Sequence, residues 1–412
     1  MSSVRREVQK VLRADACSGC GLCPLLDRGL SMQLDDGGFV RPVEVGPADD
    51  RADALRIFRR SCPGRRVDAV TPSGSSRHPL LGAYFGMWEA WAADNQIRFQ
   101  GSSGGALTAL HTWLLESGAV VQVSGAAADA ARPTRTVPVR IQSRDEALRA
   151  AGSRYAPVAV AQSAVFASNQ AMTAKPCEVA AVRAMTDADR ALQAPILLSF
   201  FCAGTPSQRA TERLISELGG PQPEAITDMW YRGRGWPGRF TAVFDGGSVS
   251  ADYDESWGAV LGPSTQWRCK VCPDGIGESA DIAAADSWDS DESGYPTFED
   301  GDGRSALIAR TERGLALVLA AEQAGILRLR PLDPEQLVAA QPLQVSRRRF
   351  LAARLLGARL AGRPVPRYRG FGLLRLQLPH PRLAIRTARG TYRRVRAAVR
   401  AARTERAGGA KG

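Results

Sequence analysis

The sequence lacks any long hydrophobic segment. Its longest apolar run, residues 194–203, has about half of the ~18–20 residues that cross a membrane as a helix. The N-terminus also lacks the apolar core of a secretory signal peptide. We therefore expect a cytoplasmic protein, whose cysteines stay reduced and whose cysteine clusters bind metal or serve catalysis rather than form disulfides.

Histidine is scarce and internal repeats are absent from the sequence. Only three of the 412 residues are histidine, so we do not expect a histidine-based metal site. What the chain does have is a hydrophobic content of 44%. Over this length, that content is enough to bury the cores of two or three domains.

From about residue 78 to residue 329, apolar runs typical of strands alternate with amphipathic helical patterns. Residues 119–123 and 196–200 have the composition of strands, and residues 208–218 have the pattern of an amphipathic helix. This alternation is typical of a mixed α/β fold. The stretch 71–76 has the composition of a linker and predicts a domain boundary near residue 70.

Positive charge is concentrated in a C-terminal extension. Residues 347–412 contain 18 Arg and one Lys against a single acid, Glu405, so this extension carries +18 and the preceding residues carry −6 of the total +12. Two helical pieces are expected in it, the second interrupted at Gly390. Their apolar faces comprise Phe350, Leu351, Leu355, Leu356 and Leu360, and then Leu383, Ile385, Ala388, Tyr392, Val395 and Val399.

The extension has three interpretations. It could be a solvated appendage outside the catalytic part of the chain. It could also bind an anionic membrane surface or an acidic partner such as a ferredoxin, through contacts that weaken with salt. Nucleic acid is not expected as a partner, because the extension offers few aromatic side chains to stack on bases.

Three closely spaced cysteines near the N-terminus indicate an iron-sulfur cluster. Cys17, Cys20 and Cys23 form C-x-x-C-x-x-C, which lets one tight loop present three thiolates to three irons of a cubane. Cys62, followed by Pro63, supplies the fourth ligand in the manner of bacterial ferredoxins. Zinc usually takes paired C-x-x-C units with a longer spacer, so these residues predict a 4Fe-4S cluster.

The other four cysteines are more scattered. Cys269 and Cys272 form C-x-x-C, Cys177 lies at a predicted helix start where the dipole favours a thiolate, and Cys202 follows a predicted strand. Four thiolates can hold one more cluster. Isolated cysteines are also common as small buried hydrophobic residues, and spacing alone leaves both interpretations open.

A loop of small residues precedes a helical pattern at residue 106. It matches neither the P-loop nor the G-x-G-x-x-G fingerprint. Small residues at a helix start let phosphate or flavin oxygens approach exposed amides, but an ordinary serine-capped turn has the same composition. The residues of interest are Gly101, Ser102, Ser103, Gly104, Gly105 and Thr108.

Eight short motifs, in this order, resemble those of the coenzyme F420 hydrogenase/dehydrogenase beta-subunit family, which includes the ferredoxin-dependent 7-hydroxymethyl chlorophyll a reductases. The resemblance covers roughly residues 12–365. The motifs are CSGCGLC (17–23), GSSGGALT (101–108), GSRY (152–155), KPCEVAA (175–181), FCAGTPS (201–207), YRGRGWPG (231–238), RCKVCPD (268–274) and ADIAAADSW (280–288).

The resemblance implies FAD and iron-sulfur clusters as cofactors, and members with matching cysteines look like two-cluster enzymes. By it, the loop at residues 101–108 corresponds to the flavin loop, and Arg154 and Tyr155 lie near the flavin. Arg232 and Gly233 belong to a loop that is close to the cofactors in the family. The basic extension beyond about residue 366 matches no family motif.

These observations predict a mixed α/β protein of four parts. Residues 1–70 would form a ferredoxin-like 4Fe-4S module, and residues 78–158 and 159–346 the two parts of a flavin-binding α/β core, the second with the second cluster. Residues 347–412 would form a basic helical extension.

The expected chemistry is electron transfer, because a flavin can exchange both hydride pairs and single electrons. The favoured hypothesis is that FAD exchanges electrons with coenzyme F420 or another hydride carrier, while the clusters serve a ferredoxin-like carrier or a partner oxidoreductase subunit. Alternatives are a ferredoxin-dependent reductase of an organic substrate without F420, and a non-catalytic electron-transfer subunit. Candidate proton donors, each equally able to be a structural hydrogen-bond partner, are Lys175, Glu178, Tyr155 and Asp286.

Overall fold

The N-terminal part of the chain builds a small module of its own. The computed structural model describes residues 3–49, 51–288 and 302–408. The module has a hairpin of two antiparallel strands beside two helices, whose apolar faces meet around Cys20, Cys23 and Cys62. Its elements are α1 (Ser3–Arg13), β1 (Leu30–Leu34), β2 (Val40–Glu44), α2 (Ala54–Ser61) and β3 (Arg66–Asp68).

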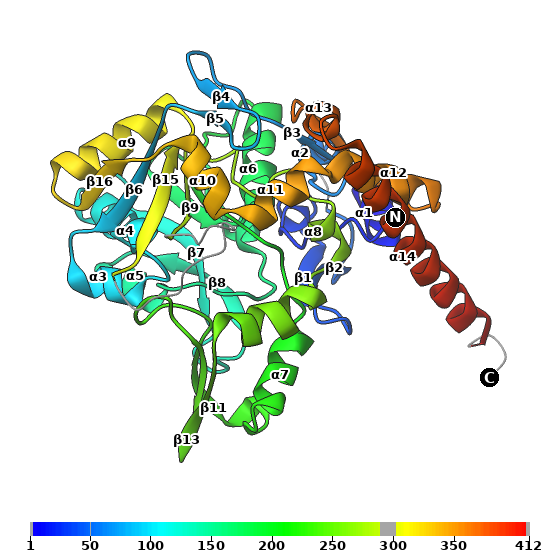
Figure 1. The fold of residues 1–412 in the computed structure, drawn as a ribbon, viewed down its shortest axis with the longest axis horizontal. Helices are drawn as coiled ribbons and strands as arrows, with labels where there is room; N and C mark the ends of the chain where they lie inside the picture. Colours follow the sequence, from blue (N-terminus) through cyan, green and yellow to red (C-terminus); the bar gives the residue numbers. More distant parts are fainter. Residues whose placement is uncertain (1–2, 50, 289–301, 409–412) are drawn as a thin grey trace.

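An eight-stranded mixed sheet forms the centre of the protein (Figure 1). Four adjacent strands, β14, β10, β9 and β7, run parallel, and the strands on both sides of them are antiparallel to their neighbours. In their order across the sheet the strands are β16 (Leu327–Pro331), β6 (Gly86–Ala92), β15 (Arg304–Ala309), β14 (Ile282–Ser287), β10 (Ile196–Phe200), β9 (Gln170–Ala174), β7 (Gln122–Ala128) and β8 (Thr136–Ile141).

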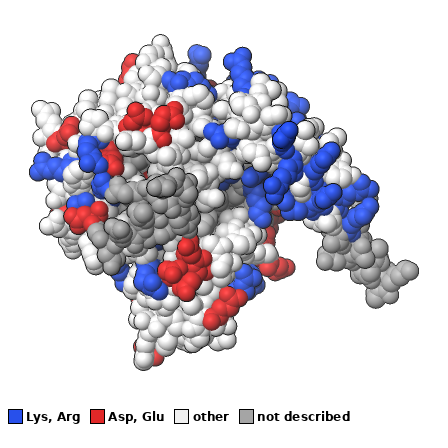
Figure 2. Space-filling model, viewed as in Figure 1, with Lys and Arg blue, Asp and Glu red and all other residues white. Residues whose placement is uncertain are grey.

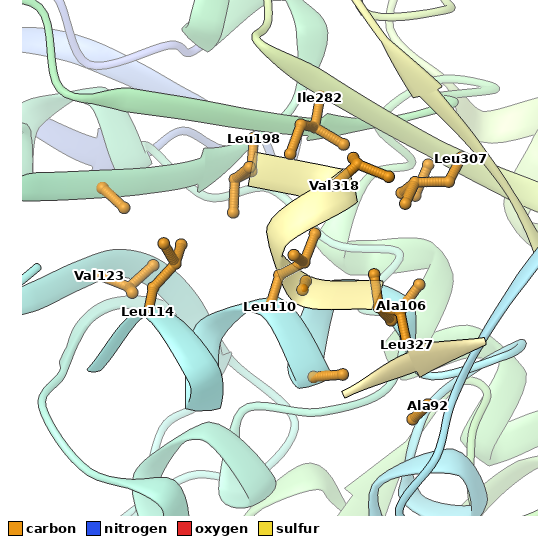
Figure 3. Packing of buried hydrophobic residues seen from close by; sticks show 14 of the residues in the cluster. Ala92, Ala106, Leu110, Leu114, Val123, Leu198, Ile282, Leu307, Val318 and Leu327 are labelled. Atoms are coloured by element: carbon orange, nitrogen blue, oxygen red, sulfur yellow. The ribbon is translucent and has the colours of Figure 1, made fainter. Parts of the chain in front are cut away.

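Alternating apolar side chains cover both faces of this sheet. Ile196 and Leu198 of β10 pack with α4 (Ala106–Glu116) and α9 (Glu312–Gln323), whereas Leu197 faces α6 (Pro176–Ala188) on the other side. Figure 3 shows Leu110 and Leu114 of α4 beneath Leu198 and Ile282 of the sheet, with Val318 of α9 between them. Helices α3 (Asn95–Gln100), α5 (Arg144–Arg149) and α10 (Pro334–Ala340) complete these layers.

A second, three-stranded antiparallel sheet is attached to the central one. It has its own apolar core, with Phe240 and Trp257 among its buried residues. Its strands are β11 (Ile226–Trp230), β12 (Phe240–Phe244) and β13 (Gly247–Ala251), and α7 (Gln208–Glu217) and a π-helical segment (Asp254–Leu261) pack beside them. The strands β4 (Ser76–His78) and β5 (Gly82–Tyr84) form a separate small hairpin.

The basic extension is helical as expected, but its first part lies inside the protein. Val271, between two cysteines of the second set, packs against Leu351 and Leu355, and its carbonyl accepts a 2.7 Å hydrogen bond from the hydroxyl of Tyr368. Strand β17 pairs in parallel with β3 of the N-terminal module. The elements are α11 (Pro342–Arg349), α12 (Leu351–Leu360), β17 (Arg367–Arg369), α13 (Leu373–Gln377) and α14 (Pro381–Gly408).

The structure confirms the mixed α/β class and several elements, and corrects others. The strand at 196–200 and the helix at 208–217 form as predicted. The strand expected at 119–123 is displaced and begins only at Gln122, because the amide of Val120 donates back to the carbonyl of Leu114 at the end of α4. Gly390 does not interrupt α14. The ferredoxin-like character of residues 1–70 remains a prediction, as do the boundaries between the four parts.

No helix within the described residues is long and apolar enough to cross a membrane.

Candidate functional site

A cavity of about 310 Å³ lies at the carboxyl ends of β9, β10 and β14. In open α/β sheets this edge is where ligands bind, because loops from several parallel strands converge there. The residues predicted from separate motifs meet in its wall: Gly101, Ser102, Ser103, Gly105, Thr108, Arg154, Tyr155, Lys175, Glu178, Cys202, Arg232 and Asp286. The other two predicted residues, Gly104 and Gly233, adjoin lining residues in the chain but do not line the cavity themselves.

The glycine loop is held against the edge of the central sheet. The amide of Gly104 donates a 3.0 Å hydrogen bond to the hydroxyl of Ser305, and the hydroxyl of Ser103 donates to the carbonyl of Arg304. A Cβ atom at Gly104 would meet the carbonyl oxygen of Ala90 at 2.4 Å, so only glycine fits. The loop ends at Gly105, whose left-handed conformation (φ 71°) begins α4 beside the cavity.

Arg232 ties three parts of the cavity wall together. Its Nη1 donates to a carboxylate oxygen of Asp286 at 2.6 Å, its Nη2 to the carbonyl of Ser102 at 2.7 Å and its Nε to the carbonyl of Pro237 at 3.1 Å. Burial opposes its charge, but Asp286 and Tyr155 outweigh burial and raise its pKa. The side chain is therefore a fixed cation in the wall of the cavity.

Backbone contacts join the other motifs to this loop. The amide of Ser153 donates to the carbonyl of Arg232 at 3.2 Å, in an antiparallel bridge. Gly233 (φ 115°) lies so close to the carbonyl of Gln100 that a Cβ would meet it at 2.7 Å. The segment 232–238, whose role the sequence left unassigned, therefore clamps the glycine loop and the residues around Gly152 onto one another.

Arg154 and Tyr155 both line the cavity, and both interact with neighbouring polar groups. The guanidinium of Arg154 donates to the carbonyls of Met229, Pro133 and Arg135 and to Thr136, which favours a structural role. Tyr155 packs its ring on Tyr231 and Trp257, at centroid distances of 5.6 and 5.0 Å. Burial raises the pKa of Tyr155, so its hydroxyl keeps its proton.

Lys175 and Glu178 form the start of the helix that carries Cys177. The carboxylate of Glu178 accepts from the backbone amide of Lys175 at 3.0 Å and from that of Val160 at 2.8 Å. Burial lowers the pKa of Lys175, but Glu178 and the thiol of Cys177 outweigh it, so the ammonium stays charged. These contacts form a capping box that fixes the position of Cys177.

His111 and Thr173 line the cavity and were missed by the sequence. A lone histidine within an apolar helical pattern carries no motif. In the structure, the Nε2 of His111 lies 2.6 Å from the hydroxyl oxygen of Thr173, across from the carboxyl end of β9. Burial lowers the pKa of His111 to about 4, so this imidazole is neutral around pH 7.

The buried state of His111 makes stability depend on pH. Its pKa is 6.5 in an exposed setting and about 4 in the fold, so between these values the unfolded chain takes up a proton that the folded chain does not. The free energy of unfolding should therefore fall as the pH falls from about 6.5 to about 4, by about 3 kcal/mol from this group. Urea unfolding of wild type and H111Q across this range tests it. Parallel pH profiles for the two proteins would contradict the assignment.

The first four cysteines are gathered in the core of the N-terminal module. Cys17, Cys20, Cys23 and Cys62 line a small apolar pocket of about 20 Å³. Burial raises the pKa of each thiol, that of Cys20 to about 11, and neighbouring thiols of the set raise the pKa values of Cys20, Cys23 and Cys62 further. The amide of Gly19 points at the sulfur of Cys17 at 3.4 Å.

The structure also gathers the four scattered cysteines. Cys202 and Cys272 each act electrostatically on Cys177, and the thiol of Cys269 contributes to raising the pKa of Cys202 to about 12, after burial. The sulfur of Cys269 accepts the amide of Thr205 at 3.3 Å. Cys202 also lines the large cavity, so this second set shares a wall with the glycine loop.

Two side chains connect the two cysteine sets. Gln266 is the N-cap of the short helix α8 (Trp267–Lys270), and Arg268 lies within that helix. The Nε2 of Gln266 donates to the carbonyl of Ser18 at 3.1 Å and lies 3.6 Å from the sulfur of Cys269. Arg268, 1% exposed, donates twice to the carbonyl of Pro63, at 3.2 and 2.9 Å. The two sets are therefore neighbours in space.

Within the described residues, no group of three or more His, Cys, Asp or Glu side chains is arranged so that it could hold a single metal ion. The two cysteine sets are thus defined by their shared burial and mutual electrostatic influence.

Two matched segments decide the family. Residues 87–164 match the N-terminal part, and residues 168–335 the C-terminal part, of the coenzyme F420 hydrogenase/dehydrogenase beta subunit. The chain belongs to this family. Membership places it among the oxidoreductases, and the matched ranges include all of the cavity motifs and the second cysteine set. The first cysteine set lies outside them.

A curated protein and a solved structure extend the similarity. The chain is 26% identical over 299 residues to the coenzyme F420 hydrogenase subunit beta of Methanococcus voltae, which covers 69% of this chain and 99% of that protein. A chain of the F420-reducing NiFe hydrogenase complex from Methanosarcina barkeri has a TM-score of 0.51 at 22% identity, covering 66% of this chain and 91% of that one. This structural likeness supports the fold.

Proposed function

We propose that the protein is an iron-sulfur flavoprotein oxidoreductase that passes electrons between coenzyme F420, or another hydride carrier, and a one-electron carrier or organic acceptor. The observation that carries this proposal is the position of Cys202. It belongs to the second cysteine set and lines the cavity that the glycine loop also lines. A flavin in the cavity and a cluster on the second set would therefore be neighbours.

The cavity fits a flavin in size and in chemistry. Its volume of about 310 Å³ lies in the range of small-molecule sites, roughly 300–1,000 Å³. The glycine loop leaves room for a ligand at the start of α4, and Arg232 supplies a buried positive charge for an anionic group. FAD would supply the exchange between electron pairs and single electrons. Gly101, Ser102, Ser103 and Arg232 are the residues that would hold it.

Each cysteine set fits a 4Fe-4S cluster by its donors and surroundings. Four thiols are present in each, the first set lies in a largely apolar setting, and backbone amides point at Cys17 and Cys269. Arg268 places a positive charge between the sets, where it would offset the negative charge of thiolate-bound clusters. The cavity adjoins the second cysteine set, and Gln266 and Arg268 connect that set to the first one. This order supports a path for single electrons between the cavity and the first set.

Tyr155 is the best placed of the four candidate proton donors. It lines the cavity, burial keeps its hydroxyl protonated, and its interactions with Arg232 and Ser153 hold that hydroxyl in place. Asp286 is engaged by Arg232 at 2.6 Å, and Lys175 and Glu178 are engaged in the capping box of α6. We therefore assign proton donation to Tyr155 and positioning to the other three residues.

Anaerobic mixing with reduced coenzyme F420 tests the hydride carrier. We expect bleaching of the flavin absorbance, followed by bleaching of the cluster absorbance. Reduction by a ferredoxin but not by F420 would instead favour a ferredoxin-dependent reductase of an organic substrate. Rapid reduction by F420 with no turnover of any acceptor would favour an electron-transfer subunit of a larger complex.

Iron counting in cysteine variants tests the two clusters separately. Wild type should contain about eight irons and eight sulfides per chain, and C20S and C269S should each contain about four, because each set holds its own cubane. Anaerobic iron and sulfide assays measure this, and each variant is the control for the other. Zinc in place of iron, or an unchanged iron content in C269S, would contradict the two-cluster assignment.

A further inference from the structure

Helix α14 carries a stripe of exposed arginines, which we call the arginine ridge. They recur every three or four residues, which at 3.6 residues per turn places all of them on one face of the helix. The ridge runs from residue 382 to residue 400, which is about 27 Å along the axis at ~1.5 Å per residue. Its members are Arg382, Arg386, Arg389, Arg393, Arg396 and Arg400, all exposed.

The opposite face of α14 is already occupied. Thr391 and Val395 are buried, and the helix packs along α12. Figure 1 shows the later turns of α14 extending away from the body of the protein. The ridge is thus the solvent-exposed side of a helix that is anchored by its other side.

Four large aliphatic side chains are exposed just before and at the start of the ridge, and we call them the aliphatic patch. Leu374 and Leu378 are 70% and 72% exposed, and Leu383 and Ile385 are 47% and 53% exposed. The sequence placed Leu383 and Ile385 on the apolar face of a helix, and in the structure both side chains are exposed. Four exposed aliphatic residues within twelve positions leave apolar area in water that a partner could bury.

The chemistry of the two features together selects the partner. The stretch from residue 347 to residue 400 contains no acid, so the arginines form a field of one sign, and Figure 2 shows Lys and Arg gathered on this side of the molecule. Guanidinium groups bind phosphate oxygens, and aliphatic side chains enter the acyl region beneath. Nucleic acid would bind the arginine ridge through its phosphates but would leave the aliphatic patch exposed to water. Phe371 is buried and cannot stack on a base.

We propose that residues 373–400 dock the protein on the surface of an anionic membrane, with the arginine ridge on the lipid phosphates and the aliphatic patch inserted between acyl chains. The orientation follows from the anchored face of α14, which keeps α12 and the second cysteine set on the side away from the lipid. This surface does not depend on the identity of the cofactors or of the substrate.

Vesicle sedimentation of the full chain tests the proposal. Wild type should bind vesicles that contain phosphatidylcholine and phosphatidylglycerol, bind those of phosphatidylcholine alone far less, and dissociate as salt is added. The variant R386E/R389E/R393E should bind anionic vesicles at least a hundredfold less, since each basic residue near such a surface contributes about 1 kcal/mol, or roughly fivefold in affinity. The variant L374S/L378S should have an affinity for anionic vesicles that is lower by about tenfold or more.

Matched controls separate the surface from general charge and hydrophobicity. R132E/R140E/R149E makes the same charge change at exposed arginines elsewhere, and V121S/L319S removes two exposed aliphatic residues elsewhere. Both should bind like wild type, and circular dichroism should show that all four variants fold. Failure of wild type to bind anionic vesicles would overturn the proposal. So would full vesicle binding by L374S/L378S, which would indicate a general polyanion site such as one for nucleic acid.

Discussion

Replacing Arg268 with methionine is expected to lower the iron content of both cysteine sets and to destabilise the fold. The guanidinium is 1% exposed and donates two hydrogen bonds to the carbonyl of Pro63, the residue after Cys62. Burial opposes its charge, but neighbouring Tyr368 and the thiols of Cys272 and Cys177 raise its pKa. Both cysteine loops therefore depend on one side chain.

The size of the destabilisation follows from the hydrogen bonds that methionine cannot make. Methionine fills part of the space but donates no hydrogen bond, so the carbonyl of Pro63 loses both of its bonds to a charged partner. Such losses cost about 3 kcal/mol in buried settings. Removal of the positive charge should also make the potentials of bound clusters more negative.

Three measurements check the Arg268 prediction: iron content, the thermal unfolding midpoint and the cluster potentials. The matched control is K270M, a neighbouring cation on the same short helix that is exposed and donates only to the carbonyl of Pro263. K270M should behave like wild type, and R268K should be intermediate because it keeps the charge but not the paired donors. Wild-type iron content and potentials in R268M would refute the bridging role.

Replacing Arg232 with methionine should weaken FAD binding by about a hundredfold. Three acceptors, on Ser102, Pro237 and Asp286, would lose their donor at once, and the glycine loop would lose its clamp. A hundredfold change corresponds to about 2.7 kcal/mol, which is within the range for losing charge-assisted hydrogen bonds. Titration of the flavin-free protein with FAD, followed by flavin fluorescence, measures it.

A control on the same loop and a double variant make the Arg232 test specific. Arg234 pairs with Asp228 at 2.8 Å and lies over the ring of Trp230, on the exposed side of the loop, so R234M should bind FAD normally. R232M/D286N removes the unpaired carboxylate and should regain stability without regaining FAD affinity. Normal FAD affinity in R232M would show that Arg232 does not position the flavin loop.

The sequence predicts best those features whose signal is local. The strand at 196–200 is a continuous apolar run, α4 begins at its glycine loop, and Cys17, Cys20 and Cys23 lie within seven residues. The order of motifs also identifies the family. In each case the residues that matter are neighbours in the chain, so their spacing carries the geometry.

Features built from distant residues could not be read in the same way. Helical periodicity shows that Leu355 and Leu356 belong to an amphipathic helix, but only the position of Val271 decides that Leu355 is buried while Leu356 is 51% exposed. The bond from Gln266 to Ser18 spans 248 positions. Arg154 was placed near the flavin by its motif, whereas its contacts with strand carbonyls appear only in the fold.

The pairing of β17 with β3 sets a late step in the biosynthesis of this protein. Arg66 of β3 pairs with Arg367 of β17, so roughly 300 residues are made after β3 before its partner exists. At ~5–20 residues per second, a ribosome needs roughly 15 to 60 s for that length. Until then the loop after Cys62 lacks one of its neighbours, and so does the segment around Val271. If the first cysteine set holds the proposed cluster, iron insertion would compete with oxidation of exposed thiols in the nascent chain, and slow translation or aerobic expression should yield protein depleted in iron.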